Sequence, residues 1–111
     1  MRKLLLSLAM IASYATAIWA VPAPVNVHWD NDTLKWELPA LTNDSVYGGI
    51  SLKLFTQSGD EISTLGTGVR TSYDFSSYFY KGRTYYAKVS SYANPGDIYS
   101  AEVVSPEYTV P

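Results

Sequence analysis

The stretch that decides the fold reads FYKGRTYYAKVSSYA, from Phe79 to Ala93. A glycine among polar residues makes a turn near its start, and the residues that follow predict a strand over 84–93. In β-sandwich proteins, a tyrosine at the start of such a strand sends its hydroxyl back to the upstream backbone and fixes the corner between the two sheets. We expect Tyr85 to be that residue.

The same strand predicts an inner and an outer row of side chains, because successive side chains of a strand point to opposite faces. If Tyr85 points inward, the inner row continues with Ala87, Val89 and Ser91. The outer row then consists of Tyr86, Lys88, Ser90 and Tyr92. We expect five residues to form the centre of the core: Trp36, Leu52, Phe75, Tyr85 and Val89.

The rest of the chain reads as short strands separated by turn signals, with no window of helical spacing. About seven strands are predicted, near residues 25–29, 33–38, 50–55, 61–65, 73–75, 84–93 and 100–110. Gly48 and Gly49 are assigned to the flexible link before the third strand. Pro106 interrupts the last strand and indicates an edge position, where a missing amide costs no ladder bond. The sequence therefore predicts an all-β fold, a two-sheet antiparallel sandwich.

The first twenty residues predict a secretory signal peptide. Two basic residues precede an apolar run at 4–12, and small residues follow, which is the order of an export signal. Cleavage after Ala17 or after Ala20 fits; we favour Ala20, which makes 1–20 the signal peptide and 21–111 a single domain. The alternative is an uncleaved membrane anchor, but the apolar run is shorter than the roughly 20 residues that a bilayer core requires.

Composition narrows the choice of partners. The chain of 111 residues has no cysteine, so an exported domain must fold without a disulfide, and no lipid-modified cysteine follows the signal. Removal of Arg2 and Lys3 with the signal leaves 6 basic against 10 acidic residues, a net charge of −4. We therefore expect no nucleic-acid partner and, after signal cleavage, no membrane association. A small cysteine-free exported domain also fits a bacterial protein better than an animal one.

Residues that could carry catalysis or bind a metal are sparse. His28 is the only histidine, which leaves no Cys/His zinc cluster and no Ser-His-Asp triad with a spare base. Asp60 and Glu61 are adjacent on a predicted strand and point to opposite faces. The Asp30–Asp32 turn lacks the later ligands of a calcium loop. We expect no enzyme, no catalytic residue, no metal site and no cofactor; a hydrolase is the weakest alternative.

Together these features resemble a fibronectin type III domain, a sandwich of immunoglobulin-like type, along nearly the whole of 21–111. That family begins with a proline-led strand, as at Pro24–Val27, and has a tryptophan in its second strand, as at Leu34–Trp36. Its strand F pattern is matched by Phe79, Gly82, Tyr85, Ala87 and Val89, and its serine-rich end by Tyr99, Ser100 and Ser105. Lys81 departs from the pattern, since the family often has proline there, and the spacing from Phe75 to Phe79 is one residue longer than usual.

The resemblance implies a secreted or cell-surface module without catalytic activity, used for adhesion, spacing or protein–protein interaction. We expect a freely secreted, extracellular monomer whose partner is a protein or a polysaccharide at the cell surface.

The surface that we expect to bind is the outward face of the strands at 50–55 and 84–93, if they pair as they do in the family. It gathers aromatic and lysine side chains: Lys53, Phe55, Tyr86, Lys88 and Tyr92. Tyrosines beside lysines can anchor a protein partner or stack on sugar rings, although scattered exposed aromatics also occur without a function. A small carbohydrate-binding module that uses Phe55, Tyr86 and Tyr92 is the alternative function.

Overall fold

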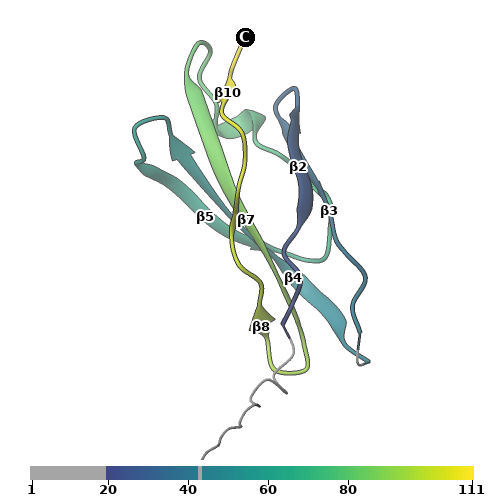
Figure 1. Cartoon of the computed structure of the whole chain (residues 1–111). Helices are drawn as coiled ribbons and strands as arrows, with labels where there is room; N and C mark the ends of the chain where they lie inside the picture. Colours follow the sequence, from purple (N-terminus) through teal and green to yellow (C-terminus); the bar gives the residue numbers. More distant parts are fainter. Residues whose placement is uncertain (1–19, 43) are drawn as a thin grey trace, which may run out of the picture.

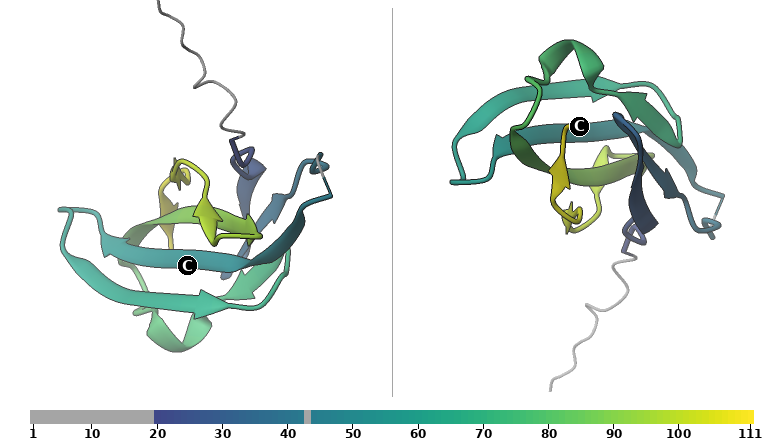
Figure 2. Two further views of the ribbon diagram at one scale, coloured as in Figure 1. Left: turned by 90° about the horizontal axis from the view of Figure 1, so that it is seen from below. Right: turned by 90° about the horizontal axis from the view of Figure 1, so that it is seen from above.

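The structure is a computed structural model that describes residues 20–42 and 44–111. Apart from Ala20, the predicted signal peptide therefore lies outside the described residues. The described chain forms two antiparallel sheets, one of three strands and one of six (Figure 1). The two sheets form the two layers of the molecule seen in Figure 2. The prediction of an all-β, two-sheet antiparallel sandwich is confirmed.

The smaller sheet has the strand order β2-β3-β6. Its strands are β2 (Val25–Asp30), β3 (Thr33–Glu37) and β6 (Ser72–Asp74). The larger sheet has the order β10-β7-β4-β5, and β8 and β9 also pair with β7. Its strands are β4 (Val46–Thr56), β5 (Glu61–Thr67), β7 (Thr84–Asn94), β8 (Ile98–Tyr99), β9 (Val103–Val104) and β10 (Tyr108–Thr109).

Helical structure in the described residues is limited to η1 (Ser76–Tyr78), a single turn of 3₁₀-helix between β6 and β7. Within this part of the chain, no helix has the length and apolar character needed to cross a membrane.

The predicted last strand, near 100–110, is in fact two short strands, and a further short strand at Ile98–Tyr99 precedes it, which raises the strand count in the described chain from about seven to nine. Two serines explain the breaks. Ser105 donates its backbone N–H to the carbonyl of Ala87 (2.8 Å), and its hydroxyl oxygen accepts the N–H of Ala87 (2.9 Å). Ser100 bonds to Ser91 in the same two ways, at 2.8 and 3.0 Å. The chain can leave the sheet at each serine because the hydroxyl replaces a backbone acceptor.

Strand β4 starts at Val46, so the two glycines assigned to a flexible link belong to a strand. The ring of Tyr92 in β7 lies directly over them: a Cβ atom would be 2.6 Å from a Tyr92 ring carbon at Gly48 and 2.5 Å from the Tyr92 hydroxyl at Gly49. An aromatic side chain on the neighbouring strand thus covers a glycine pair that has no side chain of its own to pack. This contact between distant segments is not visible in the local sequence.

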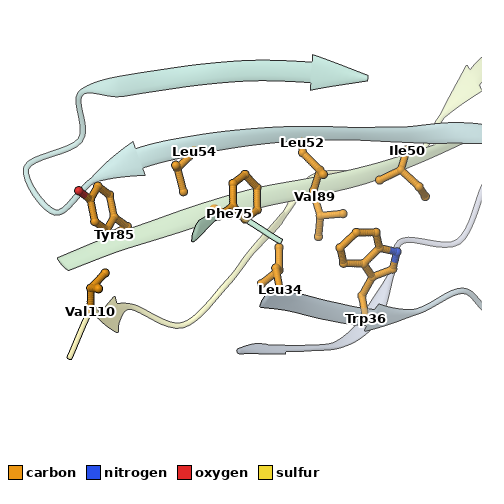
Figure 3. Close-up of a cluster of buried hydrophobic side chains, with 10 residues drawn as sticks. Leu34, Trp36, Ile50, Leu52, Leu54, Phe75, Tyr85, Val89 and Val110 are labelled. Atoms are coloured by element: carbon orange, nitrogen blue, oxygen red, sulfur yellow. The ribbon is translucent and has the colours of Figure 1, made fainter. Parts of the chain in front are cut away.

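The core lies between the sheets, and all five residues expected at its centre are buried there. Figure 3 shows Leu52 and Leu54 of β4 facing Leu34 and Trp36 of the smaller sheet. Phe75 follows β6 and fills the space between the layers. Burial of a large apolar side chain contributes roughly 1.5–3 kcal/mol, so this cluster is the main source of stability in a domain this small.

The inner row of β7 is also as predicted, since Tyr85, Ala87, Val89 and Ser91 are all buried. The outer row differs at one position, because Ser90 is buried as well. Its short side chain lies between the longer outer-row side chains of Lys88 and Tyr92 on the same strand.

Tyr85 forms the predicted corner. Its hydroxyl oxygen accepts the backbone N–H of Tyr80 at 3.0 Å, five residues upstream, and its ring stacks on Phe79 at 4.6 Å between centroids. The corner therefore joins the loop before β7 to the start of that strand by one hydrogen bond and one ring contact.

Further aromatic contacts close the same end of the sandwich. Trp29 of β2 stacks on Tyr108 of β10 at 5.1 Å between centroids and lies 5.9 Å from Phe75. The indole N–H of Trp29 donates to the carbonyl of Pro106 at 2.8 Å. These contacts tie the first and last strands together across the two sheets, in a domain that has no cysteine to cross-link them.

Candidate functional site

The five residues predicted to form the binding surface all lie on the outer face of the paired strands β4 and β7. Phe55 is opposite Tyr86, Lys53 is opposite Lys88, and Tyr92 is opposite Gly49. The name outer face is used below for this surface and for the parts of β8, of β9 and of the loop between them that adjoin it. The pairing on which the prediction depended is thus present, and it forms one row of side chains along two eleven-residue strands.

At one end of the outer face, Phe55 is covered by its neighbours. The Tyr86 ring stacks on it almost in parallel, with centroids 5.1 Å apart and planes 8° apart. The Lys88 ammonium lies 4.9 Å from the Phe55 ring centroid, a cation–π contact. Phe55 is only 8% exposed. Its role is to support the Tyr86 and Lys88 side chains, and it offers little ring surface to a ligand.

The middle of the outer face carries two lysines directly opposite each other, an arrangement that is destabilising by itself. Glu102, in the loop between β8 and β9, offsets this repulsion through an ion pair with Lys53 (Nζ to Oε2, 2.8 Å). The hydrogen bond from Lys53 lowers the pKa of Glu102, and the same bond raises the pKa of Lys53. With Lys88 included, the group has two positive charges and one negative.

The other end of the outer face is the most accessible part. The rings of Tyr92 and Tyr99 lie 5.0 Å apart between centroids, and Tyr99 is 59% exposed. Val104 of β9 is opposite Lys88 and is 56% exposed. Tyr99 is therefore presented to solvent at this end of the face, and Val104 is presented to solvent beside Lys88 in its middle.

Sequence reasoning missed Glu102, Tyr99 and Val104 as parts of this surface. Their positions depend on how the broken last strand pairs with β7, and that register is set by Ser100 and Ser105. The serines were visible in the sequence as a pattern. Their hydrogen bonds, which place the neighbouring side chains on the outer face, were not.

A second surface feature is an apolar hollow of about 490 Å³ between the β3–β4 and β5–β6 connections. Leu38, Val46 and Val69 line it, together with Tyr47, whose hydroxyl donates to the carbonyl of Pro39 at 2.6 Å. Burial raises the pKa of Tyr47. The charged and aromatic groups of the outer face do not extend to this hollow.

The polar residues weighed for catalysis lie apart from the outer face. His28 is exposed on β2, and its Nδ1 lies 2.7 Å from the backbone oxygen of Asn26. Asp30 forms an ion pair with Lys35 at 2.7 Å. Within residues 20–42 and 44–111, no group of three or more acidic, histidine or cysteine side chains could hold a metal ion.

The fold and the surface define the protein as a small, all-β sandwich with a mixed aromatic and lysine face on its larger sheet. No protein-family model matches the chain, and no curated protein is significantly similar to it.

Proposed function

We propose that this protein is an exported, non-catalytic binding module of the fibronectin type III kind, used for adhesion, spacing or protein–protein interaction. Its partner binds to the outer face. The observation that carries the proposal is the row of Tyr86, the lysine pair, Val104 and the Tyr92–Tyr99 pair on two long, regularly paired strands.

Two observations support the fibronectin type III class. Tyr85 makes the corner hydrogen bond, to the backbone of Tyr80, that is characteristic of such sandwiches. Trp36 on β3 is buried in the same cluster as the inner row of β7. Tyr85 and Trp36 are two of the residues that match the fibronectin type III pattern in the sequence.

The chemistry of the outer face fits a protein partner. Protein interfaces have an aromatic and apolar centre and a polar rim, and tyrosine is enriched at their energetically important positions. Tyr99 and Val104 supply exposed apolar area, while the two lysines and Glu102 supply charges that remain partly hydrated. Rim charges of this kind contribute more to partner choice and association rate than to affinity.

The proposal is tested by binding of the labelled, purified protein to intact cells that express its gene. The Tyr99→Ala variant should bind at least about tenfold more weakly, the effect expected for an anchor that contributes about 1.4 kcal/mol. Tyr80→Ala is the matched control, because Tyr80 is 71% exposed but lies in the loop before β7. Both variants should unfold at the same urea concentration as the parent. Equal binding by parent and Tyr99→Ala would contradict the proposal.

A carbohydrate-binding module is the second candidate, and the exposed ring of Tyr99 beside that of Tyr92 is the observation that favours it. Since Phe55 is covered, a sugar ring would stack on Tyr99 rather than on Phe55. Affinity electrophoresis in gels that contain soluble polysaccharides separates the two candidates. A carbohydrate module is retarded and loses the retardation in Tyr99→Ala, whereas a protein-binding module migrates as it does in plain gels.

A further inference from the structure

Three of the four outer sheet edges in the described chain are protected against pairing with another strand. Unpaired backbone groups at an edge attract further strands, and proteins block them with bulges, prolines, charges or very short strands. The register of β2 shifts between Val25 and His28, and Asn26 there has a φ of 54°. Strand β6 has only three residues. The edge opposite β5 is broken into three two-residue strands, with Pro106 between the last two.

Strand β5 is the exception. It forms the outer edge of the larger sheet, and no strand of the described residues lies beyond it (Figure 1). Residues 63–67 pair with β4 in unbroken register, from Ser63 opposite Leu54 to Thr67 opposite Ile50. These five residues, STLGT, include no charge and no proline. A register shift at Ile62 and the charge of Glu61 protect only the end where the strand begins.

The backbone groups that β5 leaves unpaired follow from the ladder. Both backbone groups of Ala87 bond to Ser105, on the far side of β7 from β4. Leu54, opposite Ala87, therefore directs its own N–H and carbonyl away from β7 and toward β5. Antiparallel ladders alternate with a period of two residues, so Leu52 does the same.

The partners of these two leucines in β5 are Ser63 and Leu65. The residues between and beyond them, Thr64 and Gly66, consequently direct their N–H and carbonyl groups outward, away from the sheet. Both residues are exposed. The edge thus offers two donors and two acceptors at the spacing of a regular strand.

We propose that a second copy of this chain pairs with this edge, with the two β5 strands antiparallel across a two-fold axis at Leu65. Thr64 of each copy then faces Gly66 of the other, and the outward backbone groups meet in two hydrogen-bonded pairs. Leu65 faces Leu65 of the second copy, and Ser63 faces Thr67. The result is one continuous sheet built from the two larger sheets.

The sequence of β5 suits pairing with itself. Leu65 is half-buried in the monomer and packs at the margin of the core, so contact with its copy removes further apolar surface from water. Ser63 and Thr67 form a polar pair of a kind that stabilises neighbouring strands. The antiparallel arrangement puts the two Glu61 carboxylates at opposite ends of the junction, which keeps the like charges apart. The register shift at Ile62 of each copy ends the pairing at each end of the junction.

The dimer has a consequence for binding. A two-fold axis perpendicular to the sheet leaves both outer faces on the same side, so a dimer presents two of them to one surface. Linked sites gain avidity without any new contact. Because five paired residues bury less than the roughly 1,200 Å² of a stable interface, we expect a weak dimer with a Kd on the order of 0.1 mM.

Sedimentation equilibrium of the purified protein at concentrations up to about 1 mM tests the pairing, since most of the chain is then dimeric at the expected Kd. The test variant is Thr64→Pro, which removes an outward N–H that the monomer does not use. Thr64→Val is its control, because it keeps this N–H. Both variants lack the hydroxyl that Thr64 donates to Glu61, so that loss is the same in the two proteins. The parent and Thr64→Val should dimerise, and Thr64→Pro should be monomeric with an unchanged circular dichroism spectrum. A monomeric parent, or a Thr64→Pro variant that still dimerises, would overturn the proposal.

Cross-linking tests the register. The chain has no cysteine, so Leu65→Cys introduces a single thiol. Opposed Cα atoms in a non-hydrogen-bonded pair lie about 4.5 Å apart, within the range that a disulfide spans. Mild oxidation should convert Leu65→Cys largely to a covalent dimer, whereas Val104→Cys, on the exposed outer face, should cross-link much more slowly. If replacing Leu65 unfolds the domain, the Ser63→Cys/Thr67→Cys variant tests the same register. Equal rates of cross-linking for Leu65→Cys and Val104→Cys would refute the proposed register.

Discussion

At the scale of single residues, Tyr85 makes two contacts that can be separated by mutation. Tyr85→Phe keeps the ring that stacks on Phe79 and removes the hydroxyl that accepts the N–H of Tyr80. An N–H left without a partner in a partly buried position costs about 1–3 kcal/mol. We expect the free energy of unfolding in urea to fall by that amount, and a value equal to the parent's would remove Tyr85 from the corner role.

Tyr92 contributes to the stability of the fold as well as to the outer face. It looked like a freely exposed ring in the sequence, and it is instead the cover of Gly48 and Gly49. Truncating it would uncover the β4 backbone and lower stability together with any binding. Tyr99, which adds exposed area without covering a glycine pair, is the better position for separating function from folding.

At the scale of elements, the last strand is held to β7 by serine side chains. Ser105→Ala leaves the N–H of Ala87 without its acceptor in a buried position, which should cost about 1–3 kcal/mol. Hydrogen exchange measured by NMR should show faster exchange at the Ala87 amide and little change in β3. Ser77→Ala, in the exposed η1 turn, is the control and should leave both unchanged. An Ala87 amide that exchanges at the parental rate would contradict this role of the serine.

The elements also show how far the sequence could predict the fold. Alternation and turn residues are local signals, and they located the strands around Trp36, Leu52 and Tyr85 and the core that these residues form. The start of β4 and the division of the C-terminal segment into β8, β9 and β10 depend on contacts between segments far apart in the chain. No local pattern contains the ring of Tyr92 over Gly49, so those boundaries could not be predicted.

The same difference between local sequence patterns and long-range contacts applies to the outer face. The alternation of β4 and β7 correctly placed Lys53 and Tyr86 on one side of the sheet. It could not give the burial of Phe55, which results from a ring and an ammonium group on the neighbouring strand. It also could not bring in Glu102, because that ion pair needs the register of a third segment.

At the scale of the whole molecule, stability should depend on pH through carboxyl groups. The pKa values of Glu102 and Asp30 are lowered by hydrogen bonds from lysines, and that of Asp74 by the backbone N–H of Ser76. A group whose pKa is lower in the folded state stabilises the fold above its unfolded pKa and loses that contribution as the pH falls through its folded pKa. The ordinary values are 4.5 for Glu and 3.8 for Asp.

We therefore expect the free energy of unfolding to decrease as the pH falls from about 5 to about 2. The decrease should be modest, because all three carboxyls are near the surface and screened by solvent. Urea denaturation at a series of pH values measures it. Glu102→Gln should give a shallower decrease than the parent, and an identical pH profile for both proteins would show that the ion pair with Lys53 does not stabilise the fold.

The two tryptophans of the described chain both belong to the smaller sheet and both reach the space between the layers. The indole of Trp29 contacts rings from the far end of the chain, and that of Trp36 lies in the core. Separation of the two sheets would bring both indoles into water at once, while loss of β5 alone would move neither. In the domain at 21–111, whose tryptophans are these two, the fluorescence emission is thus a built-in reporter of sheet-to-sheet contact, independent of the strand content that circular dichroism records.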